Sequence, residues 1–236
     1  MQLCPIIFVL LSSKKTKLKV VIIKYNAGNI YSVDYGLKRL GITPVITDEA
    51  EVIRSADKVI FPGQGEAGTT MSYLHHHGLD ALICELKQPV LGICIGMQLM
   101  CQHSEESNTD CLGIFDAEVK RFIPKRHEDK VPHMGWNSLT GMQEPSSGTS
   151  PESDQTCCIN NCSPQGPLFE NMPEENPYVY FVHSYYVPVT NETVAVSNYI
   201  HPFCAAMQKD NFYATQFHPE KSGKIGETIL KNFIEL

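Results

Sequence analysis

Apolar and polar residues follow two different patterns along residues 18–104 of the chain. Unbroken apolar runs predict buried strands, and segments with an apolar residue every three or four positions predict amphipathic helices. The predicted strands are 18–24, 43–48, 58–65 (which runs into a glycine-rich turn) and 88–94, and the predicted helices are 30–41, 49–57, 68–87 with a break near Gly78, and 95–104. Since a strand that is apolar throughout must bury both sides, this alternation predicts a mainly parallel sheet with helices on both faces.

The pattern changes after Cys111, where short runs are rich in β-branched and aromatic residues. They predict strands at 115–123, 178–189, 193–200, 203–209 and 212–218, followed by a closing helix at 223–236. Between these runs, residues 142–177 are rich in Pro, Ser, Gly, Asn and Glu, which is typical of a long surface loop. We therefore expect one α/β domain over residues 18–236 with a β-rich second half and an inserted surface loop at about 143–165.

The start of the chain has a short apolar run, Leu3 to Leu11, without a basic leader before it or a small-residue cleavage site after it. The run is also too short to span a bilayer. We expect residues 1–17 to be an N-terminal extension outside the fold, and we expect no membrane partner.

Composition narrows the class of function. The formal net charge of −7 leaves no basic surplus for phosphate contacts, so we expect no nucleic-acid partner. The nine cysteines are odd in number, and Cys84, Cys94, Cys101 and Cys204 lie in apolar or helical segments, which indicates a reducing, cytoplasmic location.

Two clusters of metal-ligand residue types stand out, and neither predicts a metal site. Cys157, Cys158 and Cys162 have no nearby histidine and no second Cys-x-x-Cys pair, which is a weak zinc signal. His75, His76 and His77 are adjacent on a predicted helix, so their side chains point about 100° apart and do not converge on one ion. We expect no metal and interpret the histidine run as a solvated helix end.

Cys94 lies at the junction between a predicted strand and a predicted helix. Free N–H groups and the dipole at a helix start favour a thiolate, and Gly92 and Gly96 permit a sharp bend and close approach of a substrate. This pattern resembles a nucleophile elbow with Cys in place of Ser, in which the N–H of Ile95 would face an oxyanion. The alternative is that Cys94 is a buried cysteine that packs as a small hydrophobe, and a nearby base decides between the two.

His218 is the candidate base. It ends an apolar run and lies two residues before Glu220, a spacing that puts both side chains on one side of an extended chain, and Pro219 favours that extension. Cys94, His218 and Glu220 would then supply a nucleophile, a base and a carboxylate that orients the base.

The segments "GICIGMQ" and "FHPE", together with "IFPGQG", resemble the class I triad glutamine amidotransferases, whose glutaminase domain has a flavodoxin-like α/β fold. More narrowly, "YNAGNIYSV", "VPHMGWN", "YFVHSYY" and "QFHPEKSG" are similar to the glutaminase subunits of imidazole glycerol phosphate synthase, a family of histidine biosynthesis. The resemblance runs from about Lys19 to Leu236, apart from the loop 143–165.

The resemblance implies roles for individual residues. The implied catalytic residues are Cys94 as nucleophile, His218 as general base and acid, and Glu220 as its partner. The implied oxyanion hole consists of backbone N–H groups of Ile95 and of Gly63 or Gln64, where many relatives carry a small aliphatic residue in place of Gln64. Gln98, Ser184 and Tyr185 would contact the substrate, Trp136, Tyr180 and Lys221 would face a partner subunit, and His133 and His183 would serve structure or substrate positioning. Without the resemblance, Trp136 would be read as core and Lys221 as a solvated charge.

The resemblance also implies a reaction that needs no cofactor. L-glutamine would be hydrolysed to glutamate and ammonia, and the ammonia would pass to a cyclase subunit of (β/α)8-barrel type in a heterodimer. Three alternatives stay open: an amidotransferase that supplies ammonia for anthranilate or a nucleotide, a peptidase or γ-glutamyl hydrolase that works without a partner, and an inert regulatory subunit.

Overall fold

The computed structural model describes residues 18–25, 30–63, 65–141, 163–173 and 177–236. The expected N-terminal extension (1–17), Gln64 and most of the expected loop at 143–165, with Cys157, Cys158 and Cys162, lie outside the described residues.

The largest sheet has seven strands in the order β11-β12-β13-β4-β3-β1-β2. Its strands are β1 (Val20–Ile23), β2 (Val45–Thr47), β3 (Lys58–Phe61), β4 (Val90–Ile93), β11 (Thr193–Tyr199), β12 (His201–Lys209) and β13 (Phe212–Thr215). β1 to β4 and β13 pair in parallel, while β11 and β12 extend the sheet with antiparallel pairs. The prediction of a mainly parallel sheet with a β-rich second half is confirmed.

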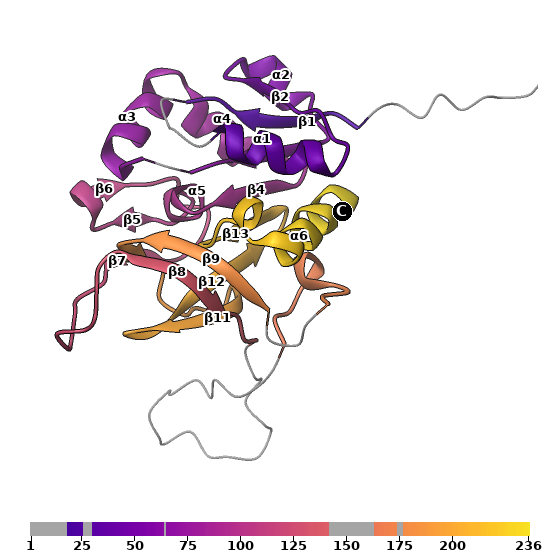
Figure 1. Cartoon of the computed structure of the whole chain (residues 1–236). Helices are drawn as coiled ribbons and strands as arrows, with labels where there is room; N and C mark the ends of the chain where they lie inside the picture. Colours follow the sequence, from indigo (N-terminus) through magenta and orange to yellow (C-terminus); the bar gives the residue numbers. More distant parts are fainter. Residues whose placement is uncertain (1–17, 26–29, 64, 142–162, 174–176) are drawn as a thin grey trace, which may run out of the picture.

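Helices cover both faces of this sheet, as predicted (Figure 1). α1 (Ile30–Arg39) and α6 (Gly223–Glu235) pack on one face, against side chains such as Val20 and Ile22. α2 (Ala50–Arg54), α3 (Ala67–His76) and α4 (Leu79–Glu85) pack on the other face, against Val21 and Ile23. Both sides of β1 are therefore buried, which explains its unbroken apolar sequence.

Two smaller sheets complete the second half. One has the order β10-β7-β5-β6, and the other is an antiparallel pair of β8 and β9, which we call the β8–β9 ribbon. Their bounds are β5 (His103–Ser104), β6 (Thr109–Asp110), β7 (Glu118–Arg121), β8 (His133–Ser138), β9 (Tyr178–His183) and β10 (Tyr185–Tyr186). Three short 3₁₀ turns are η1 (Glu106–Asn108), η2 (Pro167–Phe169) and η3 (Pro219–Lys221). The ribbon packs against α6 and β11 through buried residues such as Phe181.

The structure corrects two predicted elements. The predicted helix 95–104 is only α5 (Ile95–Leu99), because the chain turns after Met100 and residues 103–104 pair with β6 and β7. Its later apolar residues are buried in the core without being helical. The predicted strand 178–189 breaks at Ser184, so that β9 and β10 join different sheets. The sequence patterns also missed β8.

Candidate active site

The carboxyl ends of β3, β4 and β13 meet at one edge of the central sheet. β13 and β4 are parallel neighbours with Thr215 opposite Ile93, and the N–H of Cys94 donates to the carbonyl of Thr215 at 2.7 Å. The segments that follow these two strands, one with Cys94 and one with His218, therefore leave the sheet side by side.

Cys94 occupies the sharp turn between β4 and α5. Its φ of 54° and ψ of −109° lie in a region that non-glycine residues rarely adopt, which is the backbone strain expected of a nucleophile elbow. A Cβ atom on Gly96 would lie 2.2 Å from the carbonyl oxygen of Phe61, and one on Gly63 would lie 2.3 Å from that of Ile93. The turn after β3 thus touches the elbow so closely that only glycine fits at both positions.

The predicted helix dipole at Cys94 needs correction. α5 has five residues, so its dipole is small. This end of the helix therefore stabilises a Cys94 thiolate through its free N–H groups. The N–H of Ile95 is the first of these. On the other side of the elbow, the hydroxyl of Tyr25 donates to the carbonyl of Pro62 and so fixes the turn that contains Gly63.

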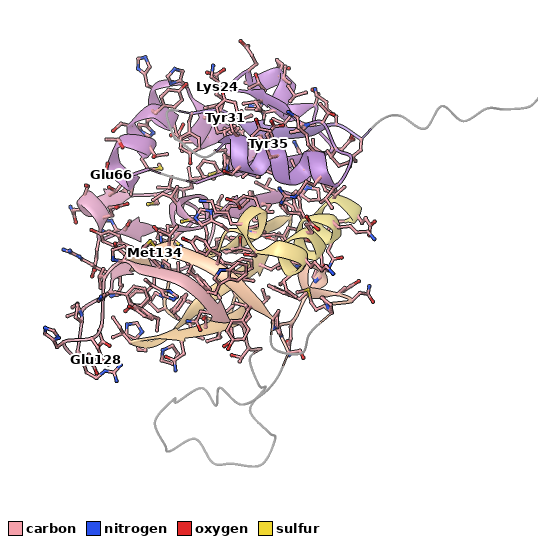
Figure 2. All side chains as sticks on the ribbon, in the orientation of Figure 1. Lys24, Tyr31, Tyr35, Glu66, Glu128 and Met134 are labelled. Carbon is pink, nitrogen blue, oxygen red and sulfur yellow. The ribbon has the colours of Figure 1, made fainter. Side chains whose placement is uncertain are left out.

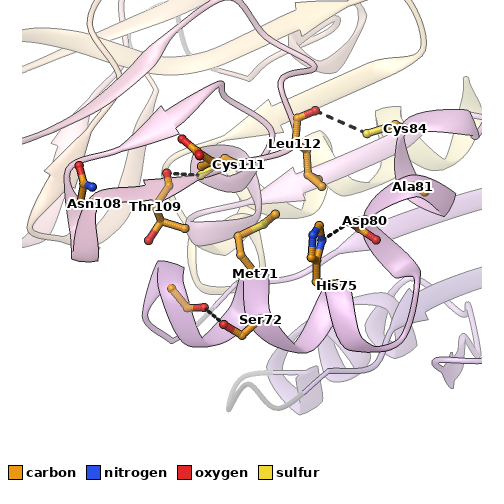
Figure 3. A pocket seen from close by; sticks show the side chains of 12 residues that line it. Met71, Ser72, His75, Asp80, Ala81, Cys84, Asn108, Thr109, Cys111 and Leu112 are labelled. Atoms are coloured by element: carbon orange, nitrogen blue, oxygen red, sulfur yellow. Dashed lines mark hydrogen bonds and ion pairs between the residues drawn. The ribbon is translucent and has the colours of Figure 1, made fainter.

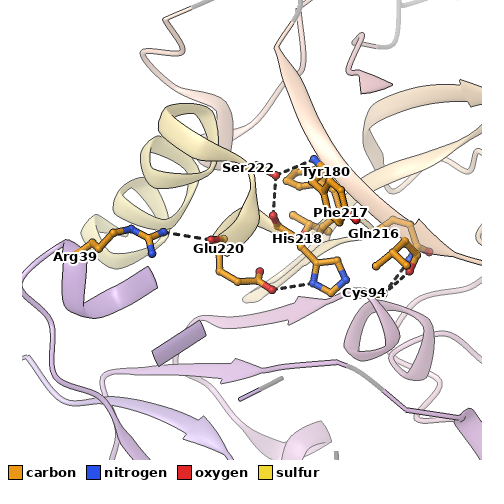
Figure 4. A network of polar contacts seen from close by, with 10 residues as sticks. Arg39, Cys94, Tyr180, Gln216, Phe217, His218, Glu220 and Ser222 are labelled. Atoms are coloured by element: carbon orange, nitrogen blue, oxygen red, sulfur yellow. Dashed lines mark hydrogen bonds and ion pairs between the residues drawn. The ribbon is translucent and has the colours of Figure 1, made fainter. Parts of the chain in front are cut away.

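His218 and Glu220 form the predicted pair, although by a different local structure. Nδ1 of His218 lies 2.8 Å from Oε1 of Glu220, and the two side chains are 1% and 0% exposed. The chain is not extended here: residues 219–221 form η3, and this tight turn brings Glu220 back to the ring. The carbonyl of Glu220 accepts from Arg39 at 3.2 Å, and Figure 4 shows the imidazole between the carboxylate and Cys94.

The charge state of His218 follows from its surroundings. Burial lowers its pKa, but the charge of Cys94, a polar contact with its thiol and the bond to Glu220 raise it, with a net pKa of about 10. Nε2, the second ring nitrogen, is buried and has no hydrogen-bond partner of ordinary geometry among the described residues. The arrangement therefore suits an imidazolium that stabilises a thiolate and can donate its Nε2 proton.

A cavity of about 380 Å³ opens over Cys94 and His218. Its lining residues are Gly65, Cys94, Ile95, Gln98, Glu106, Pro132, Val182, His183, Ser184, Tyr185 and His218. The structure thus brings the predicted nucleophile, base and three substrate-contact candidates into one cavity.

Glu106 is a cavity residue that the sequence patterns missed. Its carboxylate is half-buried and accepts the N–H of Ala67 at 2.9 Å. Burial and the charge of Glu66 raise its pKa, while the bond from Ala67 lowers it. In the sequence, nothing distinguishes Glu106 from the neighbouring Glu105, since only the turn η1 aims one of them at the cavity.

His133 and His183 form a buried pair at the cavity, which His183 lines. Nδ1 of His133 lies 3.0 Å from Nε2 of His183, whose Nδ1–H donates to the carbonyl of Tyr185 at 2.7 Å. Burial lowers their pKa values to about 4 and about 3, so both rings are neutral at pH 7. Neutral, fully engaged rings suit the structural or positioning role expected of them.

The residues expected at a partner interface lie on the β8–β9 ribbon and beside it. Trp136 is 56% exposed and packs edge-to-face on Tyr180 with ring centroids 6.0 Å apart. Met134, labelled in Figure 2, is also exposed on the ribbon. Tyr178 is exposed there as well, and Lys221 is half-buried. The alternative that Trp136 is a core residue is therefore wrong.

A larger cavity, of about 550 Å³, lies between α3, α4 and β6 (Figure 3). Its lining includes His75, Asp80, Cys84 and Cys111, and His75 is paired with Asp80. Over the ranges that the structure describes, no group of three or more histidine, cysteine or acidic side chains is arranged to hold a metal ion.

Residues 21–236 match the family model described as glutamine amidotransferase class-I. The imidazole glycerol phosphate synthase subunit HisH of Bacteroides thetaiotaomicron is 59% identical over 219 residues, which cover 93% of this chain and 100% of the relative. The HisH subunit of Pectobacterium atrosepticum is 44% identical over 220 residues, with coverage of 93% and 100%. A crystal structure of a glutamine amidotransferase shares the fold, with a TM-score of 0.63 at 16% identity and coverage of 91% and 97%. The chain therefore belongs to the class-I glutamine amidotransferase family, together with the HisH subunits of imidazole glycerol phosphate synthase.

Proposed function

We propose that this chain is the glutaminase subunit of imidazole glycerol phosphate synthase. It hydrolyses L-glutamine and passes the ammonia to a cyclase subunit, which makes imidazole glycerol phosphate and aminoimidazole carboxamide ribotide. The observation that carries this proposal is the strained Cys94 elbow in one cavity with His218, whose ring is held by Glu220 at 2.8 Å. The high identity to HisH subunits supports this assignment over an amidotransferase for anthranilate or a nucleotide.

The reaction has two stages, formation of a thioester at Cys94 and its hydrolysis. The Cys94 thiolate adds to the side-chain amide carbon of glutamine, and the N–H of Ile95 with an N–H of the Gly63–Gln64 turn receives the negative oxygen. The carbonyl re-forms, the C–N bond breaks, and His218 protonates the leaving ammonia. Water, deprotonated by His218, then adds to the thioester, and the thiolate leaves as glutamate forms. Gln64 itself is outside the described residues.

The outer residues of the cavity bind the amino-acid end of glutamine. The carboxylate of Glu106 suits the α-ammonium group, and Gln98, Ser184 and Tyr185 line the same space. Both N–H groups of the Gln98 amide are engaged, by Tyr185 and Gln216 at 2.9 Å each, which leaves its carbonyl oxygen to accept from the substrate.

The partner is a cyclase of (β/α)8-barrel type that forms a heterodimer through the β8–β9 ribbon and Lys221. The exposed aromatic and methionine side chains of the ribbon, Met134, Trp136 and Tyr178, have the character of an interface core. The ribbon also reaches the active site, because the carbonyl of Tyr180 accepts the N–H of His218 at 2.9 Å. Partner binding at the outer face of Tyr180 would therefore act on the base through one backbone bond.

Replacement of Trp136 tests this surface. Trp136→Ala should weaken binding of the cyclase about tenfold or more, as for a central aromatic anchor, while the midpoint of thermal unfolding stays unchanged. Val45→Ala is a matched control, since Val45 is 43% exposed on the far edge strand β2. Titration calorimetry with purified cyclase measures both, and equal affinity for the two variants would contradict the interface.

The overall proposal is tested by glutamate release from glutamine with and without the cyclase and its bound ligand. A rate that rises strongly with the liganded cyclase is the expected result. A rate that is independent of the cyclase would favour a hydrolase that works alone. No glutamate in either condition, with the cyclase shown to bind, would favour an inert subunit.

We also propose a cytoplasmic location for the reaction, on the basis of the biosynthetic relatives. Within the described part of the chain, no helix has both the length and the apolar character that a membrane span requires.

A further inference from the structure

Gln216 is a buried polar residue beside the Cys94 elbow, and the function proposed above uses its side chain only as an acceptor for Gln98. It follows β13, its N–H donates to the carbonyl of Ala205 at 2.8 Å, and it is fully buried. A carboxamide at this depth is kept only where its donors and acceptors are satisfied.

A backbone carbonyl fixes which way the Gln216 amide points. The carbonyl oxygen of Tyr185 only accepts hydrogen bonds, so the group of Gln98 that lies 2.9 Å from it must be the NH₂ group. The other N–H of Gln98 reaches Oε1 of Gln216 at 2.9 Å. The oxygen of Gln216 is thereby occupied, and its NH₂ group is turned to the sulfur of Cys94, 3.7 Å away (Figure 4).

We propose that Gln216 is a positioning residue of glutamine hydrolysis, which donates an N–H to the Cys94 sulfur and so holds the thiolate at the elbow. This inference rests on the proposed function. A hydrogen bond to the charged form of a group stabilises that form, and a neutral amide keeps its donor at every pH at which the enzyme works. Gln98 supplies the orientation, so the substrate-contact residue and the sulfur are linked through one amide.

The other ionisable side chains that line the cavity around the sulfur are His218, His183, Glu106 and Tyr185, and Tyr25 interacts with Cys94 from behind the elbow. His218 supplies the positive charge, and His183 is neutral at pH 7. Burial and the charge of Cys94 raise the pKa of Tyr25, which leaves its hydroxyl protonated and bonded to Pro62. Because uncharged substitutions at Gln216 leave these groups in place, a change in thiolate formation would report on the amide.

Two substitutions remove the donor in different ways. Gln216→Met keeps a similar volume, has no N–H and adds no charge, and Gln216→Leu does the same with a branched side chain. Gln208→Met is the matched control, since Gln208 lies on the adjacent strand β12 and does not line the cavity. Either Gln216 variant is informative if its circular dichroism spectrum matches that of the wild type.

The readout is the rate at which iodoacetamide alkylates Cys94 in the full chain, measured from pH 5 to 10 by mass spectrometry of the Cys94 peptide. The thiolate forms the new S–C bond and iodide leaves, so the rate follows the thiolate fraction. Loss of the N–H should raise the midpoint by about one pH unit, which makes alkylation about tenfold slower below the midpoint. In the complex with the cyclase, kcat should fall, and Gln208→Met should match the wild type.

An unchanged alkylation midpoint in a folded Gln216 variant overturns the inference. Because alkylation needs no glutamine, this result is independent of the proposed function, which fails instead if the wild type releases no glutamate. A raised midpoint with an unaltered kcat would also overturn the inference, since the amide would then act on the sulfur without acting on the reaction.

Discussion

The cavity at Cys94 and the larger cavity at Cys84 are each lined by cysteine, histidine and acidic side chains. In the first, the histidine and its carboxylate, His218 and Glu220, are 1% and 0% exposed. In the second, the corresponding pair is His75 and Asp80, which are 78% and 20% exposed. Water screens the second pair, so its contact does little to orient the ring, whereas the first pair is held in a low-dielectric environment.

The thiols of the two cavities also differ in their surroundings. Cys94 lies on a strained elbow beside an imidazole of raised pKa. Cys84 and Cys111 donate to the carbonyls of Leu112 and Thr109 at 3.6 and 3.5 Å, whereas Cys94 reaches the carbonyl of Val182 only at 3.9 Å. Burial raises the pKa of Cys84 and of Cys111, for Cys111 to about 12. The volume of a cavity and the kinds of residue in it therefore do not identify an active site, but the environment of the thiol does.

The strongest test of this comparison replaces each cysteine with alanine, which removes the thiol. Cys94→Ala should lower glutamine hydrolysis by at least about 10³-fold, because no other group in the cavity can form the thioester. Cys84→Ala should leave the rate within about twofold. Glutamate release in the presence of the cyclase measures both, and substantial activity in Cys94→Ala would remove the basis for the assignment of the nucleophile.

Neutralising the two carboxylates gives the next largest difference. Glu220→Gln should lower kcat by about 10²- to 10⁴-fold, since the amide no longer stabilises the imidazolium and can favour the wrong tautomer. Asp80→Asn is the matched change at the solvated pair and should have no effect on kcat. If the two variants retained equal activity, His218 would need no orienting group and the triad would reduce to a pair.

The pKa of His218 offers a test that needs no substrate. In the wild type, Cys94 and Glu220 raise it to about 10 against the opposing effect of burial. Cys94→Ala removes the largest of the raising effects and leaves burial, so the pKa should fall by more than about one unit. Titration of the His218 ring by NMR measures the change, with Cys84→Ala as the control. A pKa that is the same in both variants would mean that the thiol and the ring do not interact.

The elements around Cys94 were predictable because their sequence signals are local. Each of β1, β3 and β4 has buried apolar side chains on both sides. The junction of a strand, Cys94 and a helix, with Gly92 and Gly96 on either side of the cysteine, directly predicts the nucleophile elbow. The pairing of His218 with Glu220 was also expected, but from an extended chain, whereas the turn η3 produces it. Spacing alone does not distinguish these two conformations when Pro follows His.

The remaining parts depend on contacts between distant segments. β8 has polar residues and Gly135 in its sequence and exposes Met134 and Trp136, so no apolar pattern marks it as a strand. Residues after Leu99 keep helical spacing, yet bonds such as that from the N–H of Gln102 to Ala117 pull them into a sheet. The orientation of Gln216 requires the carbonyl of Tyr185, a residue that no local pattern connects to it.

The smallest difference concerns two serine hydroxyls, that of Ser222 behind His218 and that of Ser72 in the lining of the second cavity. Ser222 donates to the carbonyl of His218 at 2.7 Å and accepts the N–H of Tyr180 at 3.0 Å, and Ser72 donates to the carbonyl of Gly68 at 2.8 Å. Ser222→Ala should lower the free energy of unfolding by about 1–2 kcal/mol, because the N–H of Tyr180 loses its side-chain acceptor and the carbonyl of His218 keeps only the N–H of Lys221. It should also lower kcat a few-fold as His218 becomes less firmly held. Ser72 is exposed, so Ser72→Ala should change stability by less than about 0.5 kcal/mol and leave kcat unchanged. Urea unfolding and glutamate release measure these effects. An unchanged kcat in Ser222→Ala would show that η3 holds His218 in place without this hydroxyl.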